Sequence, residues 1–183
     1  MAKIKESKMK FATCCLLGML FITAWLLVPA KQAEAKTEKA NHKVVSSLTR
    51  VEWVAVPDVE EHVIILFERR GAAIFENGET AAYHTRGTTD SIKGHGKFHG
   101  YSDYVFKDGS TIISEYTGTI TLPPGEKLHS LKGEAKYIKG TGRFEGIKGT
   151  ASFSGNYVTP YTEDKTKGEF VIDVTATYTL PNK

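Results

Sequence analysis

The chain is poor in cysteine: 183 residues contain only two, Cys14 and Cys15, both near the N-terminus. Residues 36–183 can therefore form no disulfide bond and supply no thiolate nucleophile or thiolate metal ligand. A stretch of this length suits one domain that buries a core without covalent cross-links.

Familiar catalytic and nucleotide-binding motifs are also missing. No Gly-x-Ser-x-Gly occurs, which excludes the nucleophile elbow of the serine hydrolases. Residues 94–100 and 140–146 read Gly-x-Gly-x-x-x-Gly, and this spacing fits neither a dinucleotide fingerprint nor a Walker loop. We therefore assign no catalytic residue and expect no cofactor.

The first 35 residues have the order of a secretory signal peptide. Four lysines in the first ten residues precede an apolar run over 11–28, and Ala33-Glu34-Ala35 supplies the small residues of a cleavage site. Cleavage near Ala35 predicts a periplasmic or secreted protein with no stable membrane span. An uncleaved anchor is the alternative, because the apolar run reaches the lower limit of spanning length. The Ala-x-Ala site and the polar stretch that follows it favour cleavage.

Removal of this segment changes the charge. Taking five lysines from 24 basic residues and two glutamates from 21 acidic residues leaves 19 of each. The mature chain is then formally neutral, so no overall basic field is left to attract nucleic acid. We expect no nucleic-acid partner.

Strand patterns dominate the rest of the chain. Residues 44–56 are rich in β-branched side chains and 63–67 form a short apolar run, although 59–70 could also form one short helix. Asn77-Gly78 and Asp108-Gly109 are hairpin signals. Residues 36–43 lack an apolar pattern, which predicts a flexible tail before a folded domain at 44–183.

The last predicted strand has the clearest alternation. Between residues 170 and 180, even-numbered positions are mostly apolar and odd-numbered positions are mostly polar, so one face meets a core. Turn signals about every ten residues indicate an all-β sandwich or a closed barrel. The many glycines favour a barrel, where bends and tapers require residues without a side chain.

Two segments of the sequence are near-copies of each other. Gly94-His95-Gly96-Lys97-Phe98-His99-Gly100 recurs as Gly140-Thr141-Gly142-Arg143-Phe144-Glu145-Gly146. Both read Gly-x-Gly-basic-Phe-x-Gly between strand-like runs. We interpret each phenylalanine as a core plug beside glycine-rich turns.

These segments resemble the allene oxide cyclase-like barrel superfamily, which includes plant dirigent proteins and small exported bacterial proteins. The residues that carry the resemblance are Asp108-Gly109-Ser110-Thr111-Ile112-Ile113, the second copy at 140–146, and Gly149. The resemblance implies one closed antiparallel barrel of about eight strands with an apolar lumen. It also allows a homo-oligomer, either a dimer or a trimer. It carries over no catalytic residue.

The spacing of the histidines does not predict a metal site. His95 and His99 are four residues apart, but three glycines among residues 94–100 exclude a helix there. On a strand such positions lie about 13 Å apart, too far to share one ion. We expect no metal.

The Asp108-Gly109 hairpin supplies candidate lumen residues. A two-residue loop would pair Lys107 with Ser110 and place an apolar set on one face of the hairpin. The expected ligand-binding residues of the lumen are Phe98, Tyr104, Phe106, Ile113 and Glu115. A Glu115 side chain inside an apolar lumen would have a raised pKa and could donate a proton or anchor a ligand. The alternative is a rim position with a lysine partner.

Three functions are compatible with this sequence. The first is a barrel that binds a small apolar molecule in its lumen. The second is a filled barrel that serves as a protein-interaction module. The third is a cofactor-free cyclase or isomerase in which Glu115 or a tyrosine moves a proton. The lack of a catalytic motif favours binding.

Overall fold

The structure is a computed structural model that describes residues 37–160 and 168–182. These residues form nine strands and a single 3-10 turn, with no α-helix among them. The strands are β1 Thr37–Lys39, β2 His42–Ala55, β3 His62–Phe75, β4 Thr80–Ile92, β5 His95–Phe106, β6 Thr111–Thr121, β7 Ser130–Thr141, β8 Lys148–Tyr157 and β9 Phe170–Thr179, and the turn η2 is Gly142–Phe144. The all-β class is confirmed, and the helix alternative at 59–70 is wrong.

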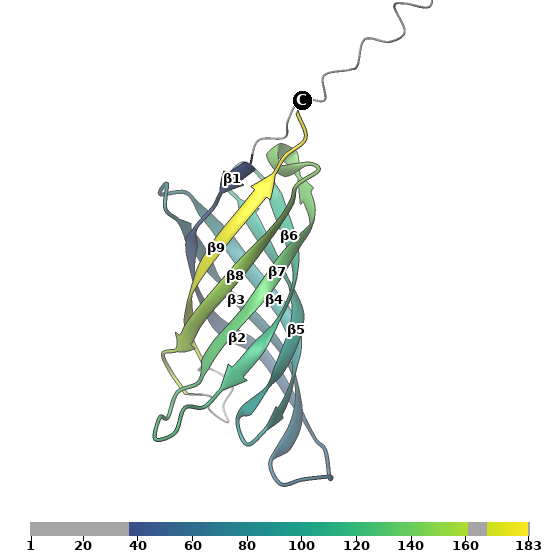
Figure 1. Cartoon of the computed structure of the whole chain (residues 1–183), viewed down its shortest axis with the longest axis vertical. Helices are drawn as coiled ribbons and strands as arrows, with labels where there is room; N and C mark the ends of the chain where they lie inside the picture. The colour runs from purple at the N-terminus through teal and green to yellow at the C-terminus, as the bar shows by residue number, and fades with distance from the viewer. Residues whose placement is uncertain (1–36, 161–167, 183) are drawn as a thin grey trace, which may run out of the picture. The chain divides into compact units, whose positions relative to one another are not determined.

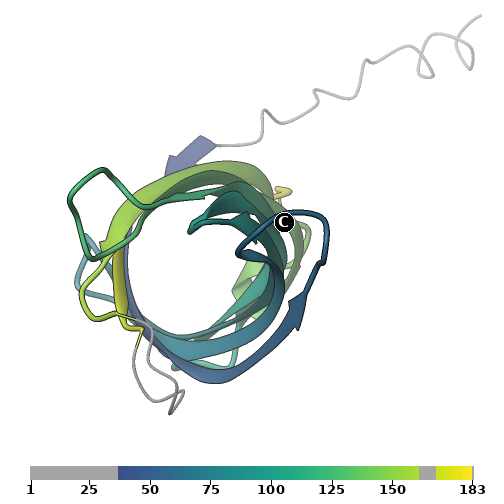
Figure 2. The same cartoon turned by 90° about the horizontal axis from the view of Figure 1, so that it is seen from below.

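The strands close into one antiparallel barrel with eight places around its wall (Figures 1 and 2). Each strand from β2 to β9 pairs with its neighbour in sequence, and β9 returns to pair with β2. The upper half of the same β9 edge pairs with β1, so β1 and β2 share one place in the wall. Closure leaves few free backbone groups at sheet edges.

The predicted flexible tail at 36–43 is wrong for its described residues. Thr37–Lys39 is strand β1, the Ala40 N–H donates to the carbonyl of Ala176, and β2 begins at His42. The cause is the open edge of β9, which offers hydrogen bonds that the composition of the segment does not reveal. The signal-peptide prediction at 1–35 lies outside the described residues.

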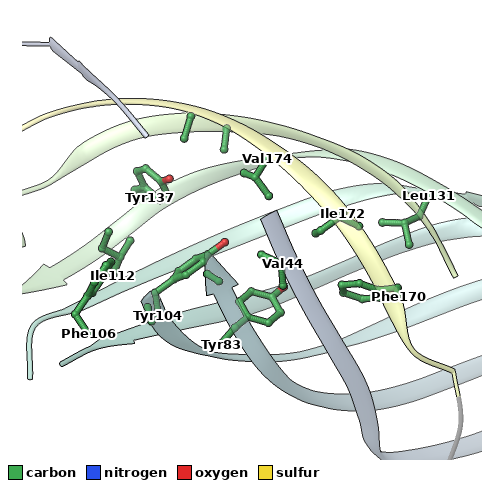
Figure 3. Close-up of a cluster of buried hydrophobic side chains, with 14 of the residues drawn as sticks. Val44, Tyr83, Tyr104, Phe106, Ile112, Leu131, Tyr137, Phe170, Ile172 and Val174 are labelled. Carbon is green, nitrogen blue, oxygen red and sulfur yellow. The ribbon is translucent and has the colours of Figure 1, made fainter. Parts of the chain in front are cut away.

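Alternation places one side of every strand inside the barrel. In β9 the predicted inner residues Phe170, Ile172, Val174 and Ala176 are buried. Figure 3 shows side chains from several strands converging on this interior, Tyr83, Tyr104 and Tyr137 among them. The barrel core is therefore a filled interior rich in aromatic rings.

The Asp108-Gly109 hairpin has a three-residue loop, so the predicted two-residue loop is wrong. The Phe106 N–H donates to the Ser110 carbonyl, and the Gly109 N–H donates to the Phe106 carbonyl. Gly109 has a φ of 80°, whereas Asp108 is not among the residues with positive φ. This is a turn that ends in a single left-handed glycine, rather than one with two positive φ angles.

The longer loop shifts the pairing of β5 with β6 by one residue from the pairing that a two-residue loop would give. Tyr104 pairs with Ile112 and Ser102 pairs with Ser114, so the even-numbered residues of both strands face inward. Ile113 and Glu115 consequently face outward, because a slip of one residue exchanges the two faces of a strand. Their predicted lumen positions are wrong.

The two phenylalanines of the repeat have different settings. Phe144 lies in η2 and is buried in the core cluster, so its predicted role as a plug is confirmed. Phe98 lies on β5, is only partly buried and packs against the same cluster. Its ring fills the space in front of Gly118, where any side chain would overlap it. Glycine at position 118 is thus a packing requirement of the barrel.

Among the described residues, no helix is long and apolar enough to cross a membrane.

Candidate functional site

The middle of the barrel is nearly filled. Its cavity has a volume of ≈60 Å³ and is lined by aromatic, aliphatic and hydroxyl side chains, with Tyr83, Tyr104, Tyr116 and Phe98 among the aromatic ones. This is space for about two waters and less than half of the roughly 150 Å³ that holds a benzene molecule in an engineered core. The centre of the lumen therefore has no room for a ring-sized ligand in this conformation.

Hydroxyl groups that line the central cavity form hydrogen bonds with one another. Ser102 and Ser114 lie 2.7 Å apart through their Oγ atoms, and Thr85 Oγ1 lies 2.7 Å from the Tyr116 hydroxyl. Burial raises the pKa of Tyr116, and burial also raises the pKa of Tyr137 to about 12. These phenols stay protonated at neutral pH and stabilise the packed interior.

Arg69 places a cation in the lower part of the lumen. Its guanidinium donates to the Gly168 carbonyl at 2.6 Å and to the Tyr157 hydroxyl at 2.7 Å. It also lies over the rings of Tyr157 and Phe170, at 4.9 and 4.5 Å from their centroids. The guanidinium joins β3 to β8 and to Gly168, which lies two residues before β9.

A larger hollow, the end pocket, lies at the end of the barrel where β1 pairs with β9 (upper end in Figure 1). Its volume is ≈260 Å³. Tyr104 and Tyr137 line both the end pocket and the central cavity. The end pocket comes close to the smallest pockets that usually hold small molecules, about 300 Å³.

Five rings from five elements form a continuous wall of this pocket, the aromatic arc. His42 stacks on Phe75 at 4.5 Å between ring centroids, and Phe75 contacts Phe106 at 5.5 Å. Phe106 contacts Phe144 at 4.8 Å, and Phe144 contacts Tyr178 at 6.3 Å. These separations are those of favourable ring pairs. The arc is a preformed surface for a flat apolar group.

His42 is the buried polar member of the arc. Its Nδ1 lies 2.9 Å from the Ala40 carbonyl, which can only accept, so Nδ1 carries the proton. Its Nε2 then accepts from the Tyr104 hydroxyl at 3.2 Å. Burial lowers the pKa of His42, against the opposing effect of the Ala40 hydrogen bond. The imidazole is therefore neutral at neutral pH.

Carboxylates ring the opening of the end pocket. Glu38 Oε2 accepts from the Tyr178 hydroxyl at 2.8 Å, and Glu76 Oε1 accepts from Asn41 Nδ2 at 3.2 Å. Glu79 is paired with the Arg143 guanidinium. These interactions hold the rim of the pocket in place. The rim consists of β1, the β1–β2 connection with Asn41, and the β3–β4 turn.

The structure divides the five predicted lumen residues. Tyr104 and Phe106 lie in the end pocket, and Phe98 lines the central cavity. Ile113 and Glu115 lie on the outer face of β6. A ligand-binding role of the three inner residues stays a prediction.

Glu115 differs most from expectation. Its carboxylate accepts from His99 Nε2 at 3.0 Å and from the Tyr101 hydroxyl at 3.4 Å on the outer wall. The His99 hydrogen bond, first among several causes, lowers the pKa of Glu115. The predicted raised pKa is therefore wrong, because the side chain is half-exposed on the outer wall and its hydrogen bond to His99 outweighs the effect of desolvation.

Sequence reasoning missed His42, Phe75 and the role of Tyr178. A signal for Phe75 was present: Phe75-Glu76-Asn77-Gly78 and Phe106-Lys107-Asp108-Gly109 share the pattern Phe-x-Asx-Gly. In both, the phenylalanine closes a three-residue loop at the same end of the barrel. Nothing local marks His42, because its burial depends on β9.

Three histidines outside the end pocket, His62, His84 and His99, form hydrogen bonds with carboxylates. His62 Nδ1 lies 2.5 Å from Asp58 and its Nε2 lies 2.8 Å from Asp90, while His84 Nδ1 lies 3.1 Å from Asp103. Within residues 37–160 and 168–182, no three His, Cys, Asp or Glu side chains form a group that could hold a metal ion.

Comparisons with known proteins find similarity in structure alone. No protein family profile and no curated protein matches the sequence. Solved structures of the pterocarpan synthase dirigent proteins GePTS1 and PsPTS1 are similar, with TM-scores of 0.46 and 0.45 and identities of 16% and 15%. The first alignment covers 85% of this chain and 95% of the other, and the second covers 81% and 97%. The closed antiparallel barrel that the predicted resemblance implied is present in this chain, as its strand pairing shows.

Proposed function

We propose that this protein is an exported barrel that binds one small, largely apolar molecule in its end pocket. The observation that carries the proposal is the ≈260 Å³ hollow walled by the aromatic arc. A flat apolar group placed there would replace water on several ring faces and gain both burial and ring contacts.

The size of the two spaces supports this location. The central cavity of ≈60 Å³ admits about two waters, whereas ≈260 Å³ corresponds to about eight or nine waters. A single substituted aromatic ring is a ligand of that size. The filled middle of the barrel then serves as the rigid floor of the site.

The polar groups of the site suit binding better than catalysis. The neutral His42 and the protonated Tyr104 already satisfy each other, and Glu115, the one carboxylate suggested as a proton carrier, lies on the outer wall. The end pocket therefore offers orientation and desolvation to a ligand, which are the properties of a binding site.

The proposal includes export. Cleavage near Ala35 would release a chain that begins one residue before the first described one, with β1 still present to close the end pocket. Retention of β1 matters because Glu38, Lys39 and the adjoining Ala40 line the pocket. Assembly into a dimer or trimer stays part of the proposal.

The test uses indole as a probe of the end pocket. Indole is titrated into the ¹⁵N-labelled mature protein, and we expect amide shifts centred on Phe75, Phe106 and Phe144. Glu38→Trp should fill the pocket and abolish these shifts, whereas Thr117→Trp, on the exposed outer wall of β6, should leave them unchanged. Shifts confined to the outer wall, no shifts in the wild type, or equal shifts in Glu38→Trp would each contradict the proposal.

A further inference from the structure

The charged side chains that line the end pocket are mostly carboxylates. The carboxylates of Glu38, Glu76 and Glu79 line it, and Lys39 is the one lysine or arginine among its described lining residues. His42 adds no charge, because its imidazole is neutral. The formal charge of this lining is therefore negative, even though the mature chain as a whole is formally neutral.

One buried acceptor in the lining lacks a donor. Asn41 Oδ1 is buried, and within the described part of the chain it has no hydrogen-bond partner. Its amide nitrogen is already used, since Nδ2 donates to the Glu76 carboxylate. A buried carbonyl without a hydrogen-bond donor is unfavourable. A ligand N–H that donates to it would remove this desolvation cost of the ligand-free protein.

The aromatic arc already accepts a cation from the protein itself. The Arg143 guanidinium lies 4.7 Å from the centroids of both the Phe106 and the Phe144 rings. This distance is typical of cation–π contacts. Rings of the arc can therefore hold a cation, but the faces that Arg143 covers are already occupied, which leaves Tyr178 as the ring for a ligand cation.

Backbone pairing brings a carboxylate next to a ring at the rim. Glu38 on β1 pairs with Tyr178 on β9, and the Tyr178 hydroxyl donates to Glu38 Oε2. A ligand cation beside Tyr178 would meet the ring face and the carboxylate together. Cations are recognised in this way when ring faces and an anion surround them.

We propose that the ligand of the end pocket is a small organic amine, bound as its ammonium ion, with an apolar body about the size of one aromatic ring. The body packs on the aromatic arc, and the ammonium donates to the rim carboxylates and to Asn41 Oδ1. A carboxylate ligand is disfavoured, because the three glutamates of the lining outnumber the two nearby cations, Lys39 and the Arg143 that is paired with Glu79. This inference rests on the proposed binding function and adds the chemical class of the ligand.

The test compares three probes that differ in one group: 2-phenylethylamine, 2-phenylethanol and phenylacetate. Calorimetry with the mature protein at pH 7 should show the amine binding at least ten-fold more tightly than the alcohol, with no binding of the acid. The preference for the amine should decrease as salt screens the rim carboxylates.

Substitutions of the rim glutamates test whether their carboxylates cause the preference for the amine over the alcohol. Glu38→Gln and Glu76→Gln should each reduce the ratio of amine to alcohol affinity several-fold. Glu134→Gln, on the exposed outer face of β7, is the matched control and should keep the ratio. Urea melts of all three variants confirm that they are folded.

The outcomes separate this inference from the proposed function. Alcohol binding equal to amine binding, or a ratio unchanged in both rim variants, would overturn the amine assignment and keep the pocket as an apolar site. Tightest binding of phenylacetate would overturn it as well. Failure of all three probes to bind would contradict the proposed function itself.

Discussion

Phe75 and Phe106 occupy equivalent positions in two different hairpins, and their rings meet 5.5 Å apart in the end pocket. Each closes a three-residue loop that ends in a left-handed glycine, Gly78 or Gly109. Two short turns thus aim two rings into the same end of the barrel. The end pocket is a consequence of turn geometry as much as of side-chain choice.

Phe144 should be essential for stability. Phe144→Ala removes a ring that is 6% exposed and contacts both Phe106 and Tyr178. We expect a loss of about 3–5 kcal/mol in the free energy of unfolding, the usual cost of removing a core phenylalanine ring. Urea melts measure it, and a loss below about 1 kcal/mol would show that the ring is not a core plug.

Gly118 should tolerate no side chain. A Cβ at this position would overlap the Phe98 ring and the Lys132 carbonyl, so Gly118→Ala should destabilise by about 1–3 kcal/mol, as overpacking does. Phe98→Leu in the same chain should recover part of the loss. Thermal melts of both variants test this, and a neutral Gly118→Ala would mean that the strands are further apart than described.

His62 should make stability depend on pH above about 6.5. Hydrogen bonds that His62 donates to the carboxylates of Asp58, first, and Asp90 raise its pKa from the ordinary value of 6.5. A raised histidine pKa contributes stability that is fully present below pH 6.5 and is lost as pH rises through the raised value. Urea midpoints of the wild type should fall in that window more than those of His62→Gln. If the urea midpoints of the wild type and His62→Gln change with pH in the same way, the contact of His62 with Asp58 and Asp90 is contradicted.

His42 should have the opposite effect. Burial lowers its pKa below 6.5, so the unfolded chain binds a proton first as the solution is acidified. The folded state then loses stability as pH falls below about 6.5. Urea midpoints between pH 7 and pH 5 should fall less for His42→Gln than for the wild type. An equal fall in both proteins would show that His42 titrates as an exposed residue.

The sequence predicted the features that depend on local periodicity. Alternation in residues 170–176 predicted the inner face of β9, because side chains on a strand alternate strictly between its two faces. Phe144 was identified as a plug because glycines flank it within a turn. The turn signals and the glycine content together predicted a closed barrel.

The features that were missed depend on contacts between distant residues. Asp-Gly is compatible with loops of two or three residues, and the difference of one residue moved Glu115 from the inner to the outer face. His42 and β1 are positioned by hydrogen bonds to the edge of β9, which lies at the other end of the sequence. The site lies where these two non-local effects meet, which is why only Tyr104 and Phe106 of the predicted residues belong to the end pocket.

The most direct test of the account is the position of a bound ligand. Intermolecular NOEs should be measured between indole and the ¹³C-labelled mature protein. The account predicts NOEs to the ring protons of Phe75, Phe106, Phe144 and Tyr178, the aromatic members of the arc beside His42. NOEs to Phe98 and Phe153 in the middle of the barrel, to His99 and Tyr101 on its outer wall, or to no ring at all would contradict it.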